Sequence, residues 1–136
     1  MKIYKIAQTN KIFEIANLVR SRLLNYHCDS EDEQCLRALC LEASRELRDE
    51  YLKNGINAIV VQGTFYVDNP NENFDEEYDD ETYNNPLHYW VEINGEIIDI
   101  TADQFNDELD GETMEGITIG GYSELTRYTV SRRGWK

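Results

Sequence analysis

The chain has 136 residues, of which 40% are hydrophobic and 11% aromatic. This length accommodates one domain with one core, and the apolar content exceeds that of disordered chains, so we expect a single domain over residues 1–136. The formal net charge of −14 repels phosphate backbones and anionic lipid surfaces. It therefore argues against nucleic acid and membranes as partners and is compatible with basic ones.

The first residues are too polar for a secretory signal, and no apolar run reaches the roughly 18 residues that span a membrane. Three cysteines without an export signal favour free thiols over a disulfide framework. We therefore expect a cytoplasmic protein with at least one thiol available for chemistry. The sequence leaves the oligomeric state open.

The N-terminal part of the chain predicts a short strand followed by a helix. The strand is expected at Lys2–Ala7, and Thr9 or Asn10 is placed to cap the helix that follows. Apolar residues recur in this helix at three- and four-residue steps as far as Leu23, which predicts one buried face.

A second helix is predicted over residues 33–53, where the pair Asn54-Gly55 ends it. An acidic stretch at its beginning favours a helix N-terminus there. The apolar stripe of this helix comprises Leu36, Leu39, Cys40, Ala43, Leu47 and Tyr51.

The middle of the chain alternates between strand and loop patterns. Ile56–Val67 is rich in β-branched and aromatic residues and predicts a buried strand in the middle of a sheet, bent near Gly63. The carboxylate-rich stretch at 68–85 predicts an acidic loop. Residues 102–116 are expected to be irregular, and residues 117–130 to supply one or two further strands before a basic tail.

Leu87–Ile93 and Glu96–Thr101 flank the pair Asn94-Gly95, which is the strongest short-range signal for a β-hairpin. A two-residue turn fixes the register of the two strands. The predicted facing pairs are Ile93 with Glu96, Val91 with Ile98, Trp90 with Asp99, and His88 with Thr101.

Side chains of this hairpin alternate between its two faces. The face suited to a core carries Tyr89, Val91, Ile93, Ile98 and Ile100. The opposite face carries His88, Trp90, Glu92, Ile97 and Asp99. His88 and Asp99 thus become diagonal neighbours, and an imidazole beside a carboxylate has a fixed tautomer and a second ring nitrogen free to meet a nucleophile.

Cys40 is the best candidate for that nucleophile. It is predicted near the start of a helix, where free backbone N–H groups and a neighbouring imidazolium favour the thiolate. The alternative is a plain core thiol on the apolar stripe of the helix. A zinc site is not expected, because the spacing of His27, Cys28, Cys35 and Cys40 lacks the close pairs of such sites.

These residues resemble a known superfamily. Cys40–Ser44, the helix end at Lys53–Ala58 and the strand Val60–Gly63 resemble the cysteine-helix-strand segment of transglutaminase-like proteins. His88–Glu92 and Ile98–Thr101 are similar to the histidine and aspartate strands of that superfamily, in the expected order Cys, His, Asp.

The resemblance covers residues 34–104 and implies an α+β, papain/transglutaminase-like core, with a nucleophile-bearing helix packed on an antiparallel sheet. It implies Cys40 as nucleophile, His88 as general base and Asp99 as orienting acid, with no metal and no organic cofactor. Gln34 lies six residues before Cys40, where papain-like peptidases place a glutamine that donates to the oxyanion. The small residues usual just before the nucleophile are absent, and the backbone N–H of Cys40 is the safer donor.

The implied activity is acyl transfer from an amide bond through a thioester, and the expected substrate is a peptide, protein or small amide, with basic substrates compatible with the acidic chain. Hydrolysis of the thioester makes the protein a peptidase or amidase, and attack by an amine makes it a transglutaminase. Trp90 is expected to shield the site or line an acyl-binding groove, or simply to pack. The remaining alternative is a non-catalytic acidic binding protein or inhibitor on the same scaffold.

Overall fold

The computed structural model describes residues 6–27, 39–69 and 86–135. In these ranges the chain forms a five-stranded sheet of order β4-β3-β2-β1-β5, in which every neighbouring pair is antiparallel. The α+β class is therefore confirmed. The elements in chain order are α1 (Ile6–His27), α2 (Cys40–Lys53), β1 (Ile59–Phe65), β2 (Leu87–Ile93), β3 (Glu96–Asp99), the 3₁₀ helix η2 (Ala102–Glu108), β4 (Thr118–Gly121) and β5 (Tyr128–Trp135).

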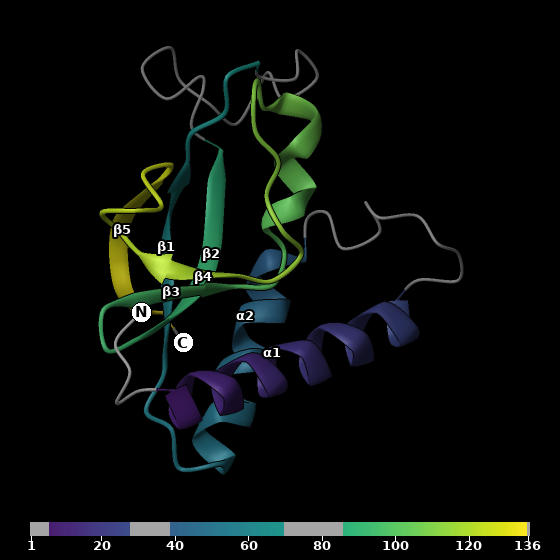
Figure 1. The fold of residues 1–136 in the computed structure, drawn as a ribbon, viewed down its shortest axis with the longest axis vertical. Helices are drawn as coiled ribbons and strands as arrows, with labels where there is room; N and C mark the ends of the chain where they lie inside the picture. Colours follow the sequence, from purple (N-terminus) through teal and green to yellow (C-terminus); the bar gives the residue numbers. More distant parts are fainter. Residues whose placement is uncertain (1–5, 28–38, 70–85, 136) are drawn as a thin grey trace.

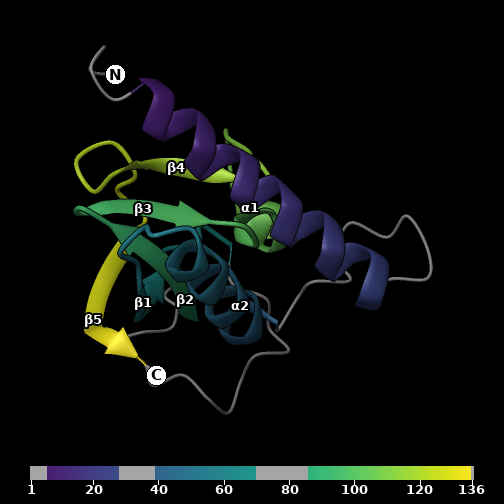
Figure 2. The same ribbon diagram turned by 90° about the horizontal axis from the view of Figure 1, so that it is seen from below.

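The sheet is strongly twisted. In Figure 1, β1 and β2 stand upright, whereas β3 and β4 run across them and β5 flanks β1 on the other side. Figure 2, seen from below, shows α2 against β1 and β2, and α1 running alongside it toward β4. The two helices thus form one layer and the sheet a second.

Helix α1 begins earlier than the sequence predicts. Ile6 and Ala7 are already helical, so the strand prediction is wrong for them, and a helix start at Thr9 or Asn10 is wrong as well. The stretch contains no proline or glycine to stop the helix from extending toward the N-terminus. Residues 2–5 lie outside the described part of the chain. The predicted buried face is confirmed by Ile15, Ala16, Val19 and Leu23.

Helix α2 begins at Cys40, because Leu39 is its N-cap and has non-helical backbone angles. The predicted helix over residues 33–53 is therefore wrong at Leu39, and residues 33–38 lie outside the described ranges. Leu39 has no polar side chain, so no side-chain cap serves the first turn. The predicted end is confirmed by the C-cap Asn54 and by Gly55, whose φ is +74°.

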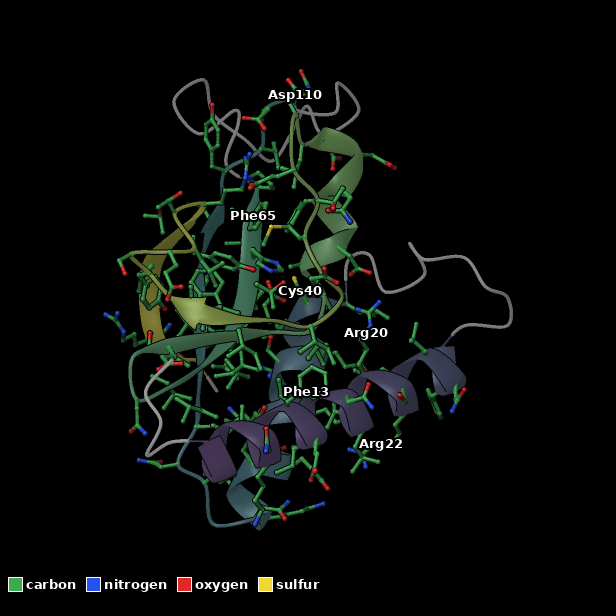
Figure 3. The ribbon with its side chains drawn as sticks, viewed as in Figure 1. Phe13, Arg20, Arg22, Cys40, Phe65 and Asp110 are labelled. Carbon is green, nitrogen blue, oxygen red and sulfur yellow. The ribbon has the colours of Figure 1, made fainter. Side chains whose placement is uncertain are left out.

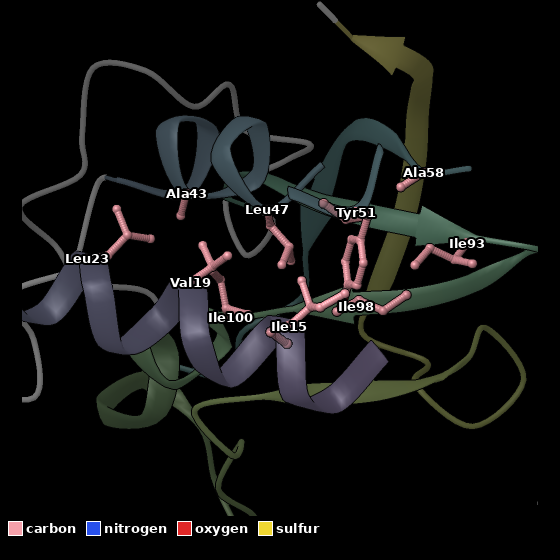
Figure 4. Close-up of a cluster of buried hydrophobic side chains, with 12 residues drawn as sticks. Ile15, Val19, Leu23, Ala43, Leu47, Tyr51, Ala58, Ile93, Ile98 and Ile100 are labelled. Carbon is pink, nitrogen blue, oxygen red and sulfur yellow. The ribbon is translucent and has the colours of Figure 1, made fainter. Parts of the chain in front are cut away.

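Two apolar clusters lie on opposite faces of the sheet. The first joins both helices to β2 and β3, and Figure 4 shows Val19, Leu47 and Ile98 meeting between these layers. The second, on the other face, consists of Val61, Phe65, Val67, Trp90, Ile97, Phe105 and Tyr128. The hairpin face that carries His88 and Asp99 therefore also forms a core, because η2 covers it with Phe105. Tyr89, predicted in the first core, is only half-buried beside Trp135.

Strand β1 lies inside the sheet, between β2 and β5, as predicted. Its pairing with β5 shifts register next to Gly63, where a Cβ would lie 2.1 Å from the carbonyl oxygen of Thr129 and 2.4 Å from the Trp90 ring. Only glycine fits between these neighbours. Strand β5 includes Arg132 and Arg133, so the expected basic tail is in part a strand.

Of the predicted acidic loop at 68–85, residues 70–85 lie outside the described ranges. Residues 102–116, predicted to be irregular, begin with η2. Within the described residues, none of the helices combines the length and apolar character needed to cross a membrane.

Candidate functional site

The hairpin of β2 and β3 positions two of the three predicted site residues. Asn94 has φ +51° and Gly95 has φ +80°, the conformation that a two-residue turn with matching twist requires. The predicted pairs Ile93–Glu96 and Val91–Ile98 are confirmed. The predicted pairs Trp90–Asp99 and His88–Thr101 are not part of the ladder. The ladder ends at Val91–Ile98, because the chain bends after β3 to enter η2.

His88 and Asp99 meet as the face pattern predicts. The Nε2 atom of His88 lies 2.6 Å from Oδ2 of Asp99. The two side chains are 0% and 1% exposed, so this pair is screened very little by solvent. An imidazole and a carboxylate are therefore held together in a low-dielectric interior.

Three further hydrogen bonds satisfy the carboxylate of Asp99. Its Oδ1 accepts from the backbone N–H of Thr101 at 2.9 Å and from the Thr101 hydroxyl at 3.3 Å. Its Oδ2 accepts from the hydroxyl of Tyr128 at 2.7 Å, in addition to the bond with His88. Burial alone would raise the pKa of Asp99, but the charge and hydrogen bond of His88 outweigh it, with Tyr128 and Thr101 adding to the lowering. Asp99 is thus kept ionised.

The protonation of His88 follows from these partners. An ionised carboxylate only accepts hydrogen bonds, so Nε2 must donate its proton to Asp99. Burial opposes the charged imidazole, yet Asp99 and the Cys40 thiol overcome this effect and raise the pKa of His88 to about 10. The second ring nitrogen, Nδ1, is buried and has no hydrogen-bond partner among the described residues. Because Nε2 is bound to Asp99, Nδ1 is the ring nitrogen left for the Cys40 thiol, whose proximity helps to raise the pKa of His88.

Cys40 is the first residue of α2 and is half-buried. Figure 3 shows its sulfur at the end of α2, beside the sheet. Burial would raise the pKa of the Cys40 thiol, but the hydrogen bond and charge of His88 outweigh it, and a backbone N–H of Tyr89 adds to the lowering. The free N–H groups of the uncapped helix start act in the same direction.

An aromatic enclosure surrounds the His88 ring. The ring centroids of Phe105, Trp90, Phe65 and Tyr128 lie 4.9, 5.8, 5.9 and 6.1 Å from that of His88. Trp90 is 0% exposed and donates from Nε1 to the Tyr122 hydroxyl at 3.0 Å. It shields the imidazole and, in this conformation, has no surface with which to line an acyl-binding groove.

Sequence reasoning missed two residues that hold Asp99. Thr101 carries a local signal, since an aspartate commonly accepts a hydrogen bond from the backbone two residues later. Tyr128 carries none, because it is 29 residues from Asp99 and comes from another strand. Gln34, the predicted oxyanion donor, lies outside the described residues.

No group of three or more metal-ligating side chains lies together in the described ranges. Cys28 and Cys35 lie outside them, as does the side chain of His27. The described donors near Cys40 are one imidazole and one carboxylate, and these already bind each other.

Comparisons with protein-family models, with curated proteins and with solved structures found no match to this chain. The inference of function therefore rests on the arrangement of Cys40, His88 and Asp99.

Proposed function

We propose that this protein is a cysteine-dependent acyl-transfer enzyme that acts on amide bonds through a thioester, with water as the main acceptor. One observation carries the proposal: Nε2 of His88 lies 2.6 Å from a buried carboxylate, Nδ1 has no partner among the described residues, and Cys40 lies near enough to raise the pKa of His88. This is the order nucleophile, base and orienting acid that activates a thiol.

The resting site is expected to be a thiolate–imidazolium pair. The pKa of His88 is raised to about 10, so both of its ring nitrogens carry a proton at neutral pH, and the lowered pKa of Cys40 favours a thiolate beside it. Cys40 is half-buried rather than sealed in the core, which is compatible with the approach of a substrate carbonyl. Asp99 supports the positive charge without taking up a proton, because its pKa is lowered.

In the first half-reaction the sulfur attacks the amide carbonyl carbon, and the carbonyl π electrons move to the oxygen. The backbone N–H of Cys40 lies at the start of α2 and is suited to donate to this oxyanion. As the sulfur moves onto the carbonyl it leaves Nδ1 of His88 open to the substrate nitrogen. The C–N bond then breaks, His88 gives its proton to the departing amine, and a thioester remains.

In the second half-reaction neutral His88 takes a proton from the acceptor, which attacks the thioester carbonyl. The C–S bond breaks, and the thiolate–imidazolium pair is restored. Water as acceptor releases a carboxylic acid, and an amine as acceptor forms a new amide. The net charge of −14 favours basic peptides or amines as substrates.

The finer fold assignment belongs to the same proposal. A helix that carries the cysteine at its first residue packs against an antiparallel sheet, and the histidine and aspartate lie on adjacent strands. These features support a papain/transglutaminase-like core. The 3₁₀ helix η2 and the aromatic side chains around His88 complete the enclosure of the base.

The test is acylation of Cys40 by an activated ester. Incubation with p-nitrophenyl acetate at neutral pH should release a burst of p-nitrophenol, and mass spectrometry of peptides should locate the acetyl group on Cys40. Cys40→Ala should abolish the burst, whereas Cys35→Ala is the matched control and should retain it. Equal and slow labelling of all three cysteines would refute the proposal and favour a non-catalytic binding protein.

The same preparation distinguishes the two acceptors. A peptide library is offered with and without a fluorescent primary amine, and new peptide ends and labelled products are measured. New carboxyl ends that depend on Cys40 indicate hydrolysis, whereas labelled peptides indicate transamidation. A chain that acylates but yields neither product would show that amides are not its substrates.

A further inference from the structure

We propose that Tyr128 is a positioning residue of this site, whose hydroxyl holds the Asp99 carboxylate in the orientation that fixes the His88 ring. The inference rests on the proposed function, and it adds a fourth member to the set of Cys40, His88 and Asp99. Tyr128 reaches neither the substrate nor the sulfur and acts through Asp99.

The geometry ties Tyr128 to the same oxygen that His88 uses. Its hydroxyl lies 2.7 Å from Oδ2 of Asp99, and Nε2 of His88 lies 2.6 Å from that atom. Oδ1 is occupied by Thr101. Rotation of the carboxylate would break bonds on both oxygens at once, so Tyr128 and Thr101 together fix its plane.

The hydroxyl can serve only as a donor here. Burial raises the pKa of Tyr128 well above its ordinary value, and the charge of Asp99 raises it further. The phenol therefore stays protonated wherever the protein is folded at moderate pH. Since the ionised carboxylate only accepts, the direction of this hydrogen bond is fixed, and so is the donation from Nε2 of His88.

The fold holds the Tyr128 ring in place. Tyr128 is 5% exposed and is the first residue of β5, where it pairs with Phe65 of β1. Its ring contacts the rings of Phe65 and Trp90 edge to face, and the centroid of the Tyr128 ring lies 5.1 Å from that of Phe65 and 5.0 Å from that of Trp90. A hydroxyl that is anchored by a strand and two aromatic contacts can orient a carboxylate instead of following it.

Removal of the hydroxyl should therefore affect the thiol at a distance. Without it, Oδ2 loses a charge-assisted bond in a buried place, and the carboxylate gains freedom to turn away from Nε2. The imidazolium of His88 is then less well supported, and Cys40 holds its proton more tightly. We expect the midpoint of Cys40 alkylation to move to higher pH, and its rate at neutral pH to fall about tenfold.

The experiment compares Tyr128→Phe with Tyr51→Phe in the full chain. Tyr51 is the matched control, because it is 0% exposed and its hydroxyl makes one 2.7 Å hydrogen bond, to the carbonyl of Ile12 and away from the site. Both variants lose a buried hydroxyl bond, and Tyr128→Phe should lose more stability because its bond goes to a charged carboxylate. Only Tyr128→Phe should change the pH profile of iodoacetamide alkylation at Cys40.

Two further measurements separate positioning from general loosening. In ¹⁵N-histidine spectra, Tyr128→Phe should change the Nε2 and Nδ1 shifts of His88, and Tyr51→Phe should leave them as in the wild type. In an Asp99→Asn background, addition of Tyr128→Phe should cause no further fall in alkylation rate, because the carboxylate that Tyr128 positions is gone. Additive losses would overturn the proposal.

If Tyr128→Phe fails to fold, 4-fluorophenylalanine at position 128 replaces the hydroxyl with a group that fills its space and cannot donate. Circular dichroism then confirms folding before alkylation is measured. A wild-type pH profile in a folded variant would overturn the role of Tyr128. Unreactive Cys40 in the wild type would instead overturn the proposed function, so the two failures are distinguishable.

Discussion

His88 is fully buried in the folded chain. Its side chain is 0% exposed, and four aromatic rings surround it. An isolated histidine in such a place would be neutral, because burial disfavours the charged form. The carboxylate of Asp99 reverses this preference and keeps the ring protonated to high pH. The state of the Cys40 thiol therefore depends on a residue that touches no solvent.

This dependence predicts how alkylation of Cys40 changes with pH. In the wild type the rate should rise as pH passes the lowered pKa of Cys40, below the ordinary range of a thiol. Amide turnover should fall again near pH 10, where His88 loses its proton. In His88→Gln the burial of Cys40 is opposed only by the Tyr89 N–H and the helix start, so the midpoint should move to higher pH than in the wild type. Iodoacetamide rates measured from pH 5 to 10 check this, and unchanged midpoints would contradict it.

The His88–Asp99 pair can be predicted from the sequence, but only part of its surroundings can. The Asn94-Gly95 turn fixes the hairpin register, and alternation then places both side chains on one face. The bond from Tyr128 depends on how β5 packs across the sheet, and no local pattern encodes that. The burial of His88 likewise depends on η2, which the sequence predicts as irregular.

At the scale of elements, α1 is joined to the segment after β3 by a single arginine. Arg20 of α1 donates to the carbonyl oxygens of Ile100 at 2.6 Å and Gly116 at 3.0 Å. It also forms a two-pronged pair with Asp103, at 2.8 and 3.2 Å. Ile100 lies between Asp99 and Thr101, so this contact holds the segment that caps the carboxylate.

Arg20→Met should therefore lower the free energy of unfolding by about 1.5–3 kcal/mol, because it leaves two carbonyl groups and a carboxylate without their charged donor. The matched control is Arg22→Met on the same helix. Arg22 pairs with Glu46 at 2.9 Å, but the two side chains are 45% and 35% exposed, so its loss should cost about 0–1 kcal/mol. Urea unfolding measures both, and equal losses would show that the Arg20 contacts add nothing special.

Element prediction succeeds here where the signal is local and fails where it is tertiary. The sequence predicts the end of α2 and the β2–β3 turn correctly, because Gly55, Asn94 and Gly95 adopt positive φ angles that few residue types tolerate. The beginnings of α1 and α2 are set differently. Ile6 carries no capping signal, and Leu39 stops the helix although its side chain suits one. Neither boundary carries a local signal from which the sequence could place it.

For the whole molecule, the buried pair links stability to pH. The pKa of His88 is about 10 in the folded chain and near 6.5 in the unfolded one, so its contribution is complete below about pH 6.5 and is lost as pH rises toward 10. The lowered pKa of Asp99 contributes stability above its ordinary range near 3.8, and this is lost as pH falls through the folded value. Stability should therefore be greatest between about pH 4 and 6.5.

Urea unfolding at pH 6 and pH 9 checks this expectation. The wild type should lose stability between the two values, and His88→Gln should lose clearly less over the same interval. The comparison removes His88 together with its effects on the pKa values of Cys40 and Asp99, while the other charges of the chain, whose formal net charge is −14, are the same in both proteins. A slope that is identical in the two proteins would contradict the raised pKa of His88.

Strand β5 completes the sheet late in the chain. It follows every other described element in the chain, yet it docks beside β1, one of the earliest strands, and its first residue supports the acid of the site. During synthesis, the cysteine, the histidine and the aspartate all emerge before this strand exists. If Tyr128 supports Asp99 as proposed, a chain in which β5 has not yet docked should hold a less reactive Cys40 thiol than the complete fold.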